Sequence, residues 1–297
     1  MRYSKPALQI PEQIRLLQSR GLLIDDFVKA ESYLSHISYY RLRAYTYPFQ
    51  DNTDSSHPFH PGVTFDDVLN VYRFDRKLRI LVFDAIERIE IALRTQIIYH
   101  CSLVHGSHFY QRGALYRNRQ NFIKDLKTAD KEAKRSTEVF IKHYKSKYSH
   151  PKRPPAWMVL EILPFGTLSK LFENLRISPE KKTIAAHFGL NIFVLESWMH
   201  TLNHVRNICA HHSRLWNRTL TQIPKLPKNP SFTWVRHAII FPDRIYATLC
   251  CIQYLLNTVS PSHTFHIRLK GLLQEYANTD LVSMGFPPDW DTEPFWK

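Results

Sequence analysis

The sequence predicts an all-α protein, on three observations. Apolar residues recur at three-and-four spacing along most of the chain. Glycine is scarce at 8 residues while aromatic residues reach 13%, and we find no β-hairpin turn signal and no internal repeat. This composition suits packed helices better than a turn-rich β-sandwich. With 297 residues, the chain can hold one large domain or two small ones with ample core.

The N-terminal segment contains two short helical patterns. Apolar positions between residues 11 and 20 fit a helix that Gly21 closes, because glycine takes the left-handed backbone after a helix end without steric cost. Asp25 and Asp26 then offer N-caps for a second helix that continues through Leu34.

Tyrosine and arginine crowd the segment Tyr39-Tyr40-Arg41-Leu42-Arg43-Ala44-Tyr45. One interpretation is an RNA-binding patch in which Tyr40 stacks on bases while Arg41 and Arg43 contact phosphates. The other is a core in which the tyrosines pack and the arginines lie at its rim. The sequence leaves both interpretations open.

A long helix is expected after the polar, proline-rich loop of residues 50–62. Thr64 is placed to cap it, and Asp66 and Asp67 put negative charge in its first turn, where the helix dipole favours it. The apolar pattern then continues from Phe65 to about Tyr99, as one helix or two. Such a length calls for a bundle of long neighbours.

Two charged pairs lie within this long pattern. Glu90 and Arg94 stand four positions apart in the orientation that favours a helical ion pair. Arg94 and His100 have an Arg-x5-His spacing, which we interpret as incidental because both residue types are common in this chain.

The segment from Arg117 to Arg153 is strongly basic. It holds 12 Lys or Arg against 4 Asp or Glu, so 12 − 4 gives +8 over 37 residues. A helical pattern occupies its centre, from Phe122 to Ala133, and prolines break it near Pro151. One interpretation is an electrostatic funnel for RNA, and the other is an ordinary solvated, lysine-rich face.

Further helices complete the predicted bundle. An apolar stretch covers residues 157–163 up to Pro164, and a proline- and lysine-rich loop covers residues 223–230. Helices are expected over residues 167–175, 179–188 (with Gly189 as its stop), 191–213 and 242–259.

The strongest functional signal is Arg206-Asn207-Ile208-Cys209-Ala210-His211, inside the helix expected over residues 191–213. An arginine clamps phosphate through a planar fork of donors, and a histidine moves protons near neutral pH. At 100° per residue, His204, Asn207 and His211 fall on the face opposite the apolar residues. These polar side chains therefore avoid the core-facing stripe.

Arg206 and His211 differ by about 140° around the helix axis, so one copy does not easily aim both groups at one atom. Two copies related by a two-fold axis can assemble such a site, and isologous dimers are the commonest oligomers. We therefore expect a homodimer. His204, His212 and Arg214 are the second-rank candidates for RNA contact.

The histidines of this helix begin a metal-ligand pattern, but their spacing argues against a metal site. His200 and His204 stand four apart and His211 shares their face, which is the beginning of a ligand set. However, His211 is about 10 Å beyond His204 along the axis, whereas zinc bonds are about 2 Å long. The helix also lacks the glutamate of a metalloprotease motif. We expect neither a metal nor another cofactor.

The composition and the missing motifs exclude several classes of enzyme and indicate the cellular compartment. Without a G-x-S-x-G stretch or a glycine-rich phosphate loop, serine hydrolysis and common nucleotide-dependent phosphotransfer find no support. Four cysteines, none in a C-x-x-C motif, indicate a reduced, cytosolic chain with buried thiols. The sequence indicates neither a secretion signal nor a membrane span. The net charge of +14 favours polyanionic partners such as RNA.

Arg206-Asn207-x3-His211 resembles the R-[polar]-x3-H signature of HEPN domains, which are all-α ribonuclease modules. The chain also resembles bacterial abortive infection (Abi) proteins of the AbiD and AbiF types, from about residue 5 to residue 260. That likeness rests on Lys5-Pro6-Ala7, Ser19-Arg20-Gly21-Leu22, Ile37-Ser38-Tyr39-Tyr40-Arg41-Leu42, Tyr72-Arg73-Phe74-Asp75-Arg76-Lys77-Leu78-Arg79, Ile89-Glu90-Ile91-Ala92-Leu93-Arg94-Thr95 and residues 206–216.

The resemblance implies a HEPN-like helical bundle with additional N-terminal and C-terminal helices. We expect residues 1–60 to form an N-terminal helical segment packed on the core. Residues 61–260 would form the HEPN-like domain with a basic insertion at about 117–153, and residues 261–297 a C-terminal extension of open role. The family also implies a phage-defence or toxin-like role in the cytoplasm, and neutralisation by a cognate antitoxin, either RNA or protein.

Two functional hypotheses follow. The first is a metal-independent endoribonuclease in which Arg206 holds the phosphate and His211 acts as general acid or base. In that mechanism, Asn207 orients the imidazole or the phosphate by hydrogen bonding. The second is a non-catalytic RNA-binding or protein-interaction module that uses the basic segment.

Overall fold

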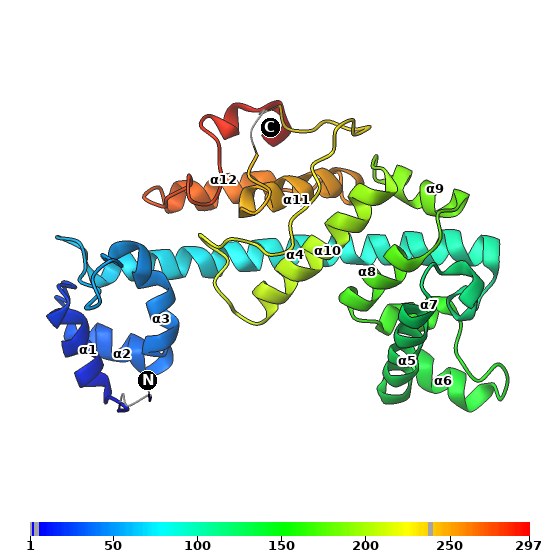
Figure 1. Ribbon diagram of the computed structural model, residues 1–297, viewed down its shortest axis with the longest axis horizontal. Helices are drawn as coiled ribbons and strands as arrows, with labels where there is room; N and C mark the ends of the chain where they lie inside the picture. Colours follow the sequence, from blue (N-terminus) through cyan, green and yellow to red (C-terminus); the bar gives the residue numbers. More distant parts are fainter. Residues whose placement is uncertain (1, 3–5, 237–239) are drawn as a thin grey trace. The chain divides into compact units, whose positions relative to one another are not determined.

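The regular structure of the described residues is entirely helical. The computed structural model describes residues 2, 6–236 and 240–297, so Lys5 of the Lys5-Pro6-Ala7 likeness lies outside them. Within these ranges there are twelve α-helices and only isolated β-bridges, which confirms the all-α prediction. The helices in Figure 1 are α1 (Ile10–Ser19), α2 (Phe27–His36), α3 (Tyr39–Thr46), α4 (Phe65–His105), α5 (Arg119–Arg135), α6 (Val139–Lys147), α7 (Ala156–Val159), α8 (Phe165–Asn174), α9 (Pro179–His187), α10 (Ile192–Ala210), α11 (Ile245–Val259) and α12 (Phe265–Glu275).

Six short 3₁₀ turns join these helices in the described part of the chain. They are η1 (Tyr47–Phe49), η2 (Phe109–Gln111), η3 (Gly113–Leu115), η4 (Leu160–Ile162), η5 (Trp290–Thr292) and η6 (Pro294–Trp296). The apolar stretch expected over residues 157–163 is thus one α-helical turn followed by η4. None of the described helices combines the length and apolar character that crossing a bilayer requires.

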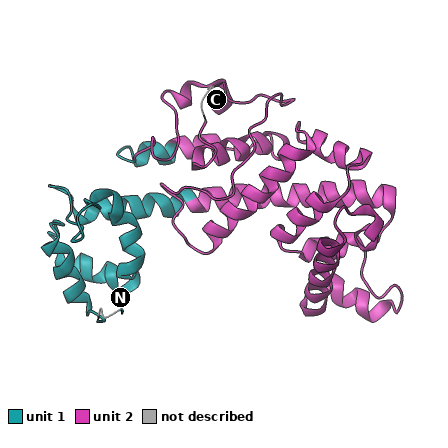
Figure 2. Cartoon of the chain, viewed as in Figure 1, with its two compact units in different colours: residues 1–78, 271–279 teal, residues 79–270, 280–297 magenta. Residues whose placement is uncertain are grey.

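The chain divides into two compact units (Figure 2). Unit 1 comprises residues 1–78 and 271–279, and unit 2 comprises residues 79–270 and 280–297. Helix α4 contributes its first turns to unit 1 and the rest to unit 2. The expected division of the chain near residues 60 and 260 stays a prediction.

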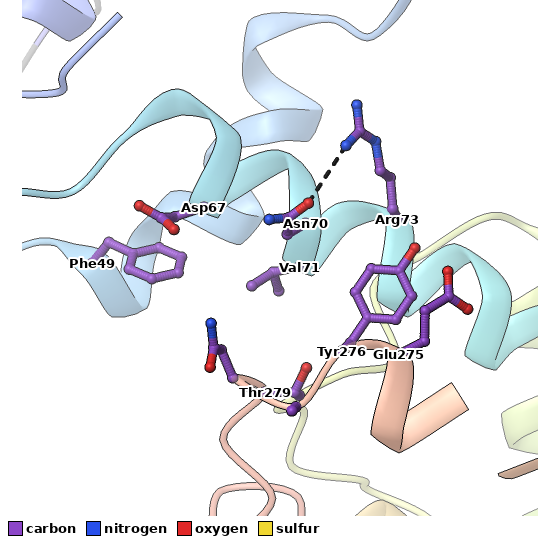
Figure 3. A pocket seen from close by; sticks show the side chains of 10 residues that line it. Phe49, Asp67, Asn70, Val71, Arg73, Glu275, Tyr276 and Thr279 are labelled. Atoms are coloured by element: carbon purple, nitrogen blue, oxygen red, sulfur yellow. Dashed lines mark hydrogen bonds between the residues drawn. The ribbon is translucent and has the colours of Figure 1, made fainter. Parts of the chain in front are cut away.

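Unit 1 begins with the two capped helices expected from the sequence. Gly21 has a φ of +93° at the end of α1, and the Asp26 carboxylate accepts a hydrogen bond from the backbone N–H of Lys29 at the start of α2. Helices α1 and α2 pack on each other through buried apolar side chains, namely Ile14, Leu17, Ala30 and Leu34. The first turns of α4 and the end of α12 border a cavity in this unit (Figure 3).

Helix α4 is a single helix of 41 residues, which resolves the choice between one helix and two. Thr64 caps it as expected, since its Oγ1 accepts from the backbone N–H of Asp67 at 3.2 Å. The helix continues beyond Tyr99 to His105. It ends there because Gly106 takes a φ of +82° and its N–H bonds back to the Ser102 carbonyl.

The basic segment of unit 2 contains two helices where the sequence indicated one. Helix α5 matches the expected pattern, and its N-cap Asn118 accepts from the Asn121 N–H at 2.9 Å. Helix α6 was not predicted because it is short and buries only two side chains, Ile141 and Tyr144. Two such positions are too few to define a helical period.

The core of unit 2 is built around α10 and α11. Helix α10 packs against α8, α9 and α11, and α11 is buried on nearly every side. Residues 280–297 close this core with an aromatic cluster, in which Trp296 is fully buried and its Nε1 donates to the Tyr246 hydroxyl at 3.2 Å. Helix α11 begins at Ile245 rather than Pro242, because the Asp243 carbonyl accepts instead from the Leu220 N–H.

Candidate functional site

Helix α10 carries the Arg206–His211 motif and ends earlier than the sequence predicted. Asn191 caps its start by accepting from the Val194 N–H at 3.0 Å. The helix stops at Ala210 rather than Ser213, because His212 takes a left-handed backbone with a φ of 56°. His211 is therefore the C-cap residue, and its N–H bonds to the Asn207 carbonyl at 3.0 Å.

The two faces of α10 separate as expected. Its core-facing side chains, Trp198, Met199, Leu202, Val205 and Cys209, are all buried. On the other face, His200, His204 and Asn207 are partly exposed and His211 is exposed. The prediction that the motif's polar residues avoid the core is confirmed.

Arg206 lies against α4, with its side chain 36% exposed. Its Nε is 4.0 Å from Oε2 of Glu90, and its guanidinium lies 5.9 Å from the centre of the Phe83 ring. Its Nη1 donates to Asn207 Oδ1 at 3.3 Å. The ion pair is long and the group is partly open, so a phosphate that reached Arg206 would compete with Glu90 for it.

A single copy does not join the two motif groups. Among the described residues, no hydrogen bond links Arg206 to His211. The arginine contacts Glu90 of α4 and Asn207, while His211 is exposed after the last residue of the helix. Of the predicted site residues, Asn207 accepts a hydrogen bond from Arg206.

Glu90 is shared between two arginines of different character. Its Oε1 pairs with Arg94 Nη2 at 2.7 Å, which confirms the expected helical ion pair, while its Oε2 faces Arg206. Arg94 is 5% exposed and also donates to the carbonyls of Leu160 and Leu163. Arg94 is therefore committed to holding η4 against α4, which agrees with interpreting its spacing to His100 as incidental.

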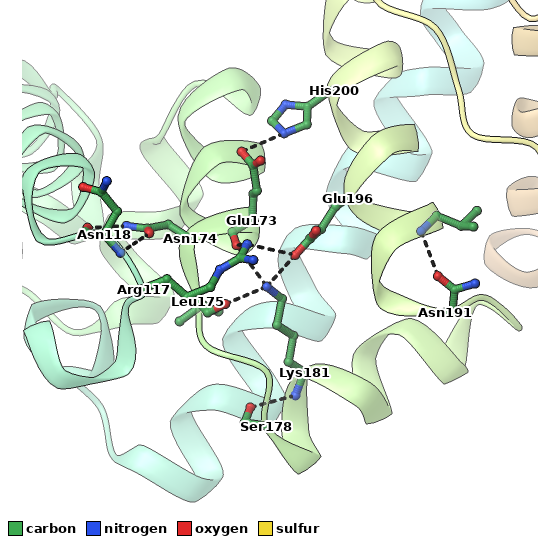
Figure 4. Close-up of polar contacts among 11 residues, drawn as sticks. Arg117, Asn118, Glu173, Asn174, Leu175, Ser178, Lys181, Asn191, Glu196 and His200 are labelled. Carbon is green, nitrogen blue, oxygen red and sulfur yellow. Dashed lines mark hydrogen bonds and ion pairs between the residues drawn. The ribbon is translucent and has the colours of Figure 1, made fainter.

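A buried ion pair anchors the first half of α10 (Figure 4). Lys181 on α9 is fully buried, and its ammonium group donates to Glu196 Oε1 at 2.6 Å and to the carbonyls of Leu175 at 2.7 Å and Glu173 at 3.1 Å. These three acceptors match its three protons. Burial lowers the pKa of Lys181, and the Glu196 carboxylate opposes that shift. No local pattern in the sequence predicts this pair.

His200 forms part of a serine–histidine–glutamate series that is structural. Ser169 Oγ is 3.0 Å from His200 Nδ1, and Glu173 Oε2 is 3.0 Å from His200 Nε2. Ser169 is only 1% exposed, so no substrate can reach its hydroxyl. The series ties α8 to α10, and serine hydrolysis gains no support from it.

His204 is more buried than His211. Burial, with the positive charge of Arg218 as a second cause, lowers the pKa of His204. Its Nε2 lies 3.5 Å from the Thr221 hydroxyl. A neutral imidazole there can exchange hydrogen bonds but brings no positive charge to a phosphate. In the described part of the chain, no three His, Cys, Asp or Glu side chains are arranged to hold a metal ion.

The remaining predicted RNA contacts lie in two places. His212 and Arg214 follow α10 directly in unit 2. The tyrosine–arginine segment forms α3 of unit 1. Its Tyr45 is buried and donates to Asp75 Oδ2 at 2.6 Å, as the core interpretation expects, whereas Tyr40 is 85% exposed and its contact with RNA stays a prediction. Arg41 and Arg43 lie on the same helix, Arg41 exposed and Arg43 partly so.

All four cysteines are buried free thiols, as expected. Burial raises the pKa of Cys101 to about 12, which leaves its sulfur protonated and unreactive. These thiols therefore belong to the core and not to the candidate site.

Comparison with known proteins gives one family. A family model described as Abi-like protein matches residues 32–217, more than half of the chain. The matched segment includes both Arg206 and His211. No curated protein and no solved structure matches the chain.

Proposed function

Because the chain belongs to the Abi-like protein family, we propose that it is an abortive-infection endoribonuclease that acts in phage defence. Its substrate is single-stranded RNA, and it uses no metal. Its site combines Arg206 of one copy with His211 of another, at the interface of a HEPN-like homodimer in the cytoplasm. A cognate antitoxin, RNA or protein, neutralises it.

One observation carries this proposal. The C-terminal end of α10 presents a partly exposed guanidinium and, one residue past the helix, an exposed imidazole. Neither of these side chains is held in the core. Arg94 and His200, by contrast, are each bound by at least two structural partners. The first half of α10 is fixed by the Lys181–Glu196 pair, so the motif sits on a rigid support.

The chemistry follows the ordinary course of metal-free RNA cleavage. The 2′-oxygen attacks the adjacent phosphorus and forms a new P–O bond, while the bond from phosphorus to the 5′-oxygen breaks. One proton leaves the 2′-hydroxyl and one reaches the 5′-oxygen, and His211 moves one of them. Arg206 stabilises the charge that grows on the phosphate oxygens. The products are a 2′,3′-cyclic phosphate and a 5′-hydroxyl.

The surface beside Arg206 supports pairing of two copies. Ile80, Phe83 and Ile91 lie on one face of α4 and are exposed by 53%, 38% and 53%. Apolar side chains gathered in this way on a helix face favour contact with another protein surface. Since Arg206 lies over Phe83, a second copy on this face would stand next to the guanidinium.

Mixing two inactive variants tests the shared site. Arg206→Ala and His211→Ala proteins should each lose cleavage. In a mixed dimer, one site regains an intact Arg206 and an intact His211, so random exchange of copies should restore about a quarter of the native rate. No recovery after verified exchange would contradict a site built from two copies. Ile91→Glu should give monomers and abolish cleavage at the same concentration.

The His211→Ala variant tests the catalytic role itself. It should keep its fold and RNA affinity and lose cleavage by at least about a hundredfold. His187→Ala, at the end of α9, is a matched control that should cleave normally. Cleavage that survives the loss of His211 removes that residue from the mechanism.

A non-catalytic RNA-binding or protein-interaction module is the second candidate function. It is favoured by one observation: Lys124, Lys127 and Lys131 line a single exposed face of α5. Such a module would bind RNA with a steep salt dependence and leave it whole. Labelled RNA incubated with the protein in EDTA separates the two candidates, because cleavage products support the nuclease and retarded, intact RNA supports the module. Cleavage only with added divalent metal would contradict the metal-free mechanism.

A further inference from the structure

Unit 1 contains a cavity that plays no part in the Arg206–His211 chemistry. Its volume is about 510 Å³, and every residue that lines it belongs to unit 1. The lining comes from η1, the first turns of α4, the end of α12 and the residues that follow, and it includes Phe49, Asn70, Tyr276 and Asn278. The volume is of the size of small-molecule sites and has room for a nucleoside.

Two aromatic rings stand on opposite sides of this cavity, Phe49 on one and Tyr276 on the other (Figure 3). The Tyr276 ring is held by its neighbours, with the Phe74 ring 5.7 Å away and the Lys77 ammonium 5.3 Å from its centre. Aromatic side chains that are fixed in this way favour a flat ligand, because stacking needs little reorganisation.

The polar groups of the cavity suit a neutral ring with donors and acceptors. Asn70 and Asn278 bring side-chain amides, and Thr279 brings a hydroxyl. An amide carries a donor beside an acceptor, which is the pattern that pairs with the edge of a nucleobase. Asn70 Oδ1 accepts from Arg73 Nη1 at 3.4 Å, which is a weak contact. The NH₂ group of the Asn70 amide can donate to a ligand.

Each charged group that lines the cavity already has a polar partner. The Asp67 carboxylate accepts from the Thr64 N–H at 2.9 Å and from its hydroxyl at 2.7 Å. Glu275 pairs with Lys77, and Arg73 donates to the Tyr33 hydroxyl at 2.5 Å. With two acids and one base in its lining, the cavity lacks the positive excess that a bare phosphate needs. Its lining mixes polar and apolar groups in similar measure, whereas a lipid or aliphatic ligand needs a predominantly apolar lining.

We propose that this cavity binds one nucleobase, stacked beside Phe49 and Tyr276 and read along its edge by Asn70 and Asn278. The phosphates of the ligand stay outside. Two sources share this chemistry, namely a free nucleotide and an unpaired nucleotide of an RNA strand. The cavity stands independently of the catalytic motif, and only the RNA source rests on the proposed function.

Binding measurements on two variants test the site. Asn278→Ala removes an exposed amide, and Ala277→Trp fills the cavity from an exposed position. Both are made in the full chain with His211→Ala, so that RNA stays intact. Each is titrated by calorimetry with AMP, GMP, CMP and UMP, and by fluorescence anisotropy with eight-nucleotide single-stranded RNAs. Asn229→Ala, an exposed asparagine in unit 2, is the matched control, and circular dichroism checks the fold.

We expect at least one nucleotide or RNA to bind about tenfold more weakly to both variants, and to bind the control unchanged. Weakening of RNA alone assigns the cavity to a base within a strand, and weakening of a mononucleotide alone assigns it to a free nucleotide. Unchanged affinity for all ligands in both variants overturns the proposal.

The outcome is separable from that of the proposed function. Base binding is read in the His211→Ala background and cleavage is read with the native chain, so the two readouts are independent. Failure of the cavity therefore leaves cleavage in place. Failure of the nuclease leaves base binding to be measured as before.

Discussion

The end of α10 and the exposed face of α5 are the two regions for which we propose contact with RNA, and they differ in kind. The end of α10 offers two different groups in fixed places, Arg206 beside Glu90 and His211 past the last turn. The face of α5 offers three like groups in a row, Lys124, Lys127 and Lys131. The role proposed for the end of α10 depends on where its two groups are placed. The role proposed for the face of α5 depends only on its positive charge.

This difference separates chemistry from affinity. A reacting phosphate needs a donor fork and a proton carrier at set positions, and a small displacement costs much of the rate. Lysines on a helix face neutralise phosphates at any position along the strand, because the electrostatic attraction does not depend on an exact alignment of strand and helix. Changes at the two regions should therefore alter different quantities, and any mixing of the two effects would weaken the comparison.

The largest expected effect is that of Arg206→Ala on the rate of cleavage. We expect kcat to fall by about 10²–10³, because the guanidinium stabilises charge that develops in the transition state. Arg206→Lys should recover only part of this, since an ammonium lacks the two-pronged fork. RNA affinity should change little. Single-turnover cleavage at saturating RNA measures the effect, with Arg15→Ala as an exposed arginine control.

A loss of affinity without a loss of rate in Arg206→Ala would break the comparison. It would move Arg206 into the same class as the lysines of α5.

Replacing Lys124, Lys127 and Lys131 together by alanine should act on affinity. The slope of log affinity against log salt should flatten by about 2, since each single-strand phosphate contact contributes about 0.7. Binding at physiological salt should weaken by about tenfold or more, and the cleavage rate at saturating RNA should stay unchanged. Anisotropy at several salt concentrations measures the slope, and Lys228→Ala is an exposed control.

An unchanged salt slope in this triple variant would mean that RNA does not meet α5. The electrostatic funnel would then have to lie elsewhere.

The sequence predicted most helices because their signals are local. Apolar spacing, Asp26, Asn191 and Gly21 all act within a few residues of the element that they define. The same local reasoning placed the motif on the polar face of α10. It failed at the end of that helix, because nothing nearby shows that His212 would take a left-handed backbone.

The contacts that surround the motif could not be predicted in this way. Glu90 faces Arg206 across more than a hundred positions, and Lys181 meets Glu196 from a separate helix. In a single sequence these residues look like ordinary surface charges, since Lys and Glu are seldom buried. Only the packing of α4, α9 and α10 brings the partners together.

The smallest expected effect concerns Asp125, which lies on α5 beside Lys124. Burial, partly offset by Lys170 and Lys124, raises the pKa of Asp125 from 3.8 to about 6. A raised carboxyl pKa means that folding favours the protonated form. The stability that protonated Asp125 contributes to the folded state is fully present below about pH 4 and is lost as the pH rises through about 6. At neutral pH the ionised, half-buried carboxylate therefore opposes folding.

Asp125→Asn should remove this opposition and add a positive unit to α5. At pH 7.5 the variant should be more stable than the native protein by about 1 kcal/mol, a modest figure because solvent screens a half-exposed group. Near pH 4 the two proteins should be equally stable. Urea unfolding at both pH values measures this, and an equal difference at both would show that the titration of Asp125 is not its cause. RNA affinity above pH 6 should rise slightly while the cleavage rate stays fixed, because a charge on α5 changes how firmly RNA is held and leaves the groups at the end of α10 where they are.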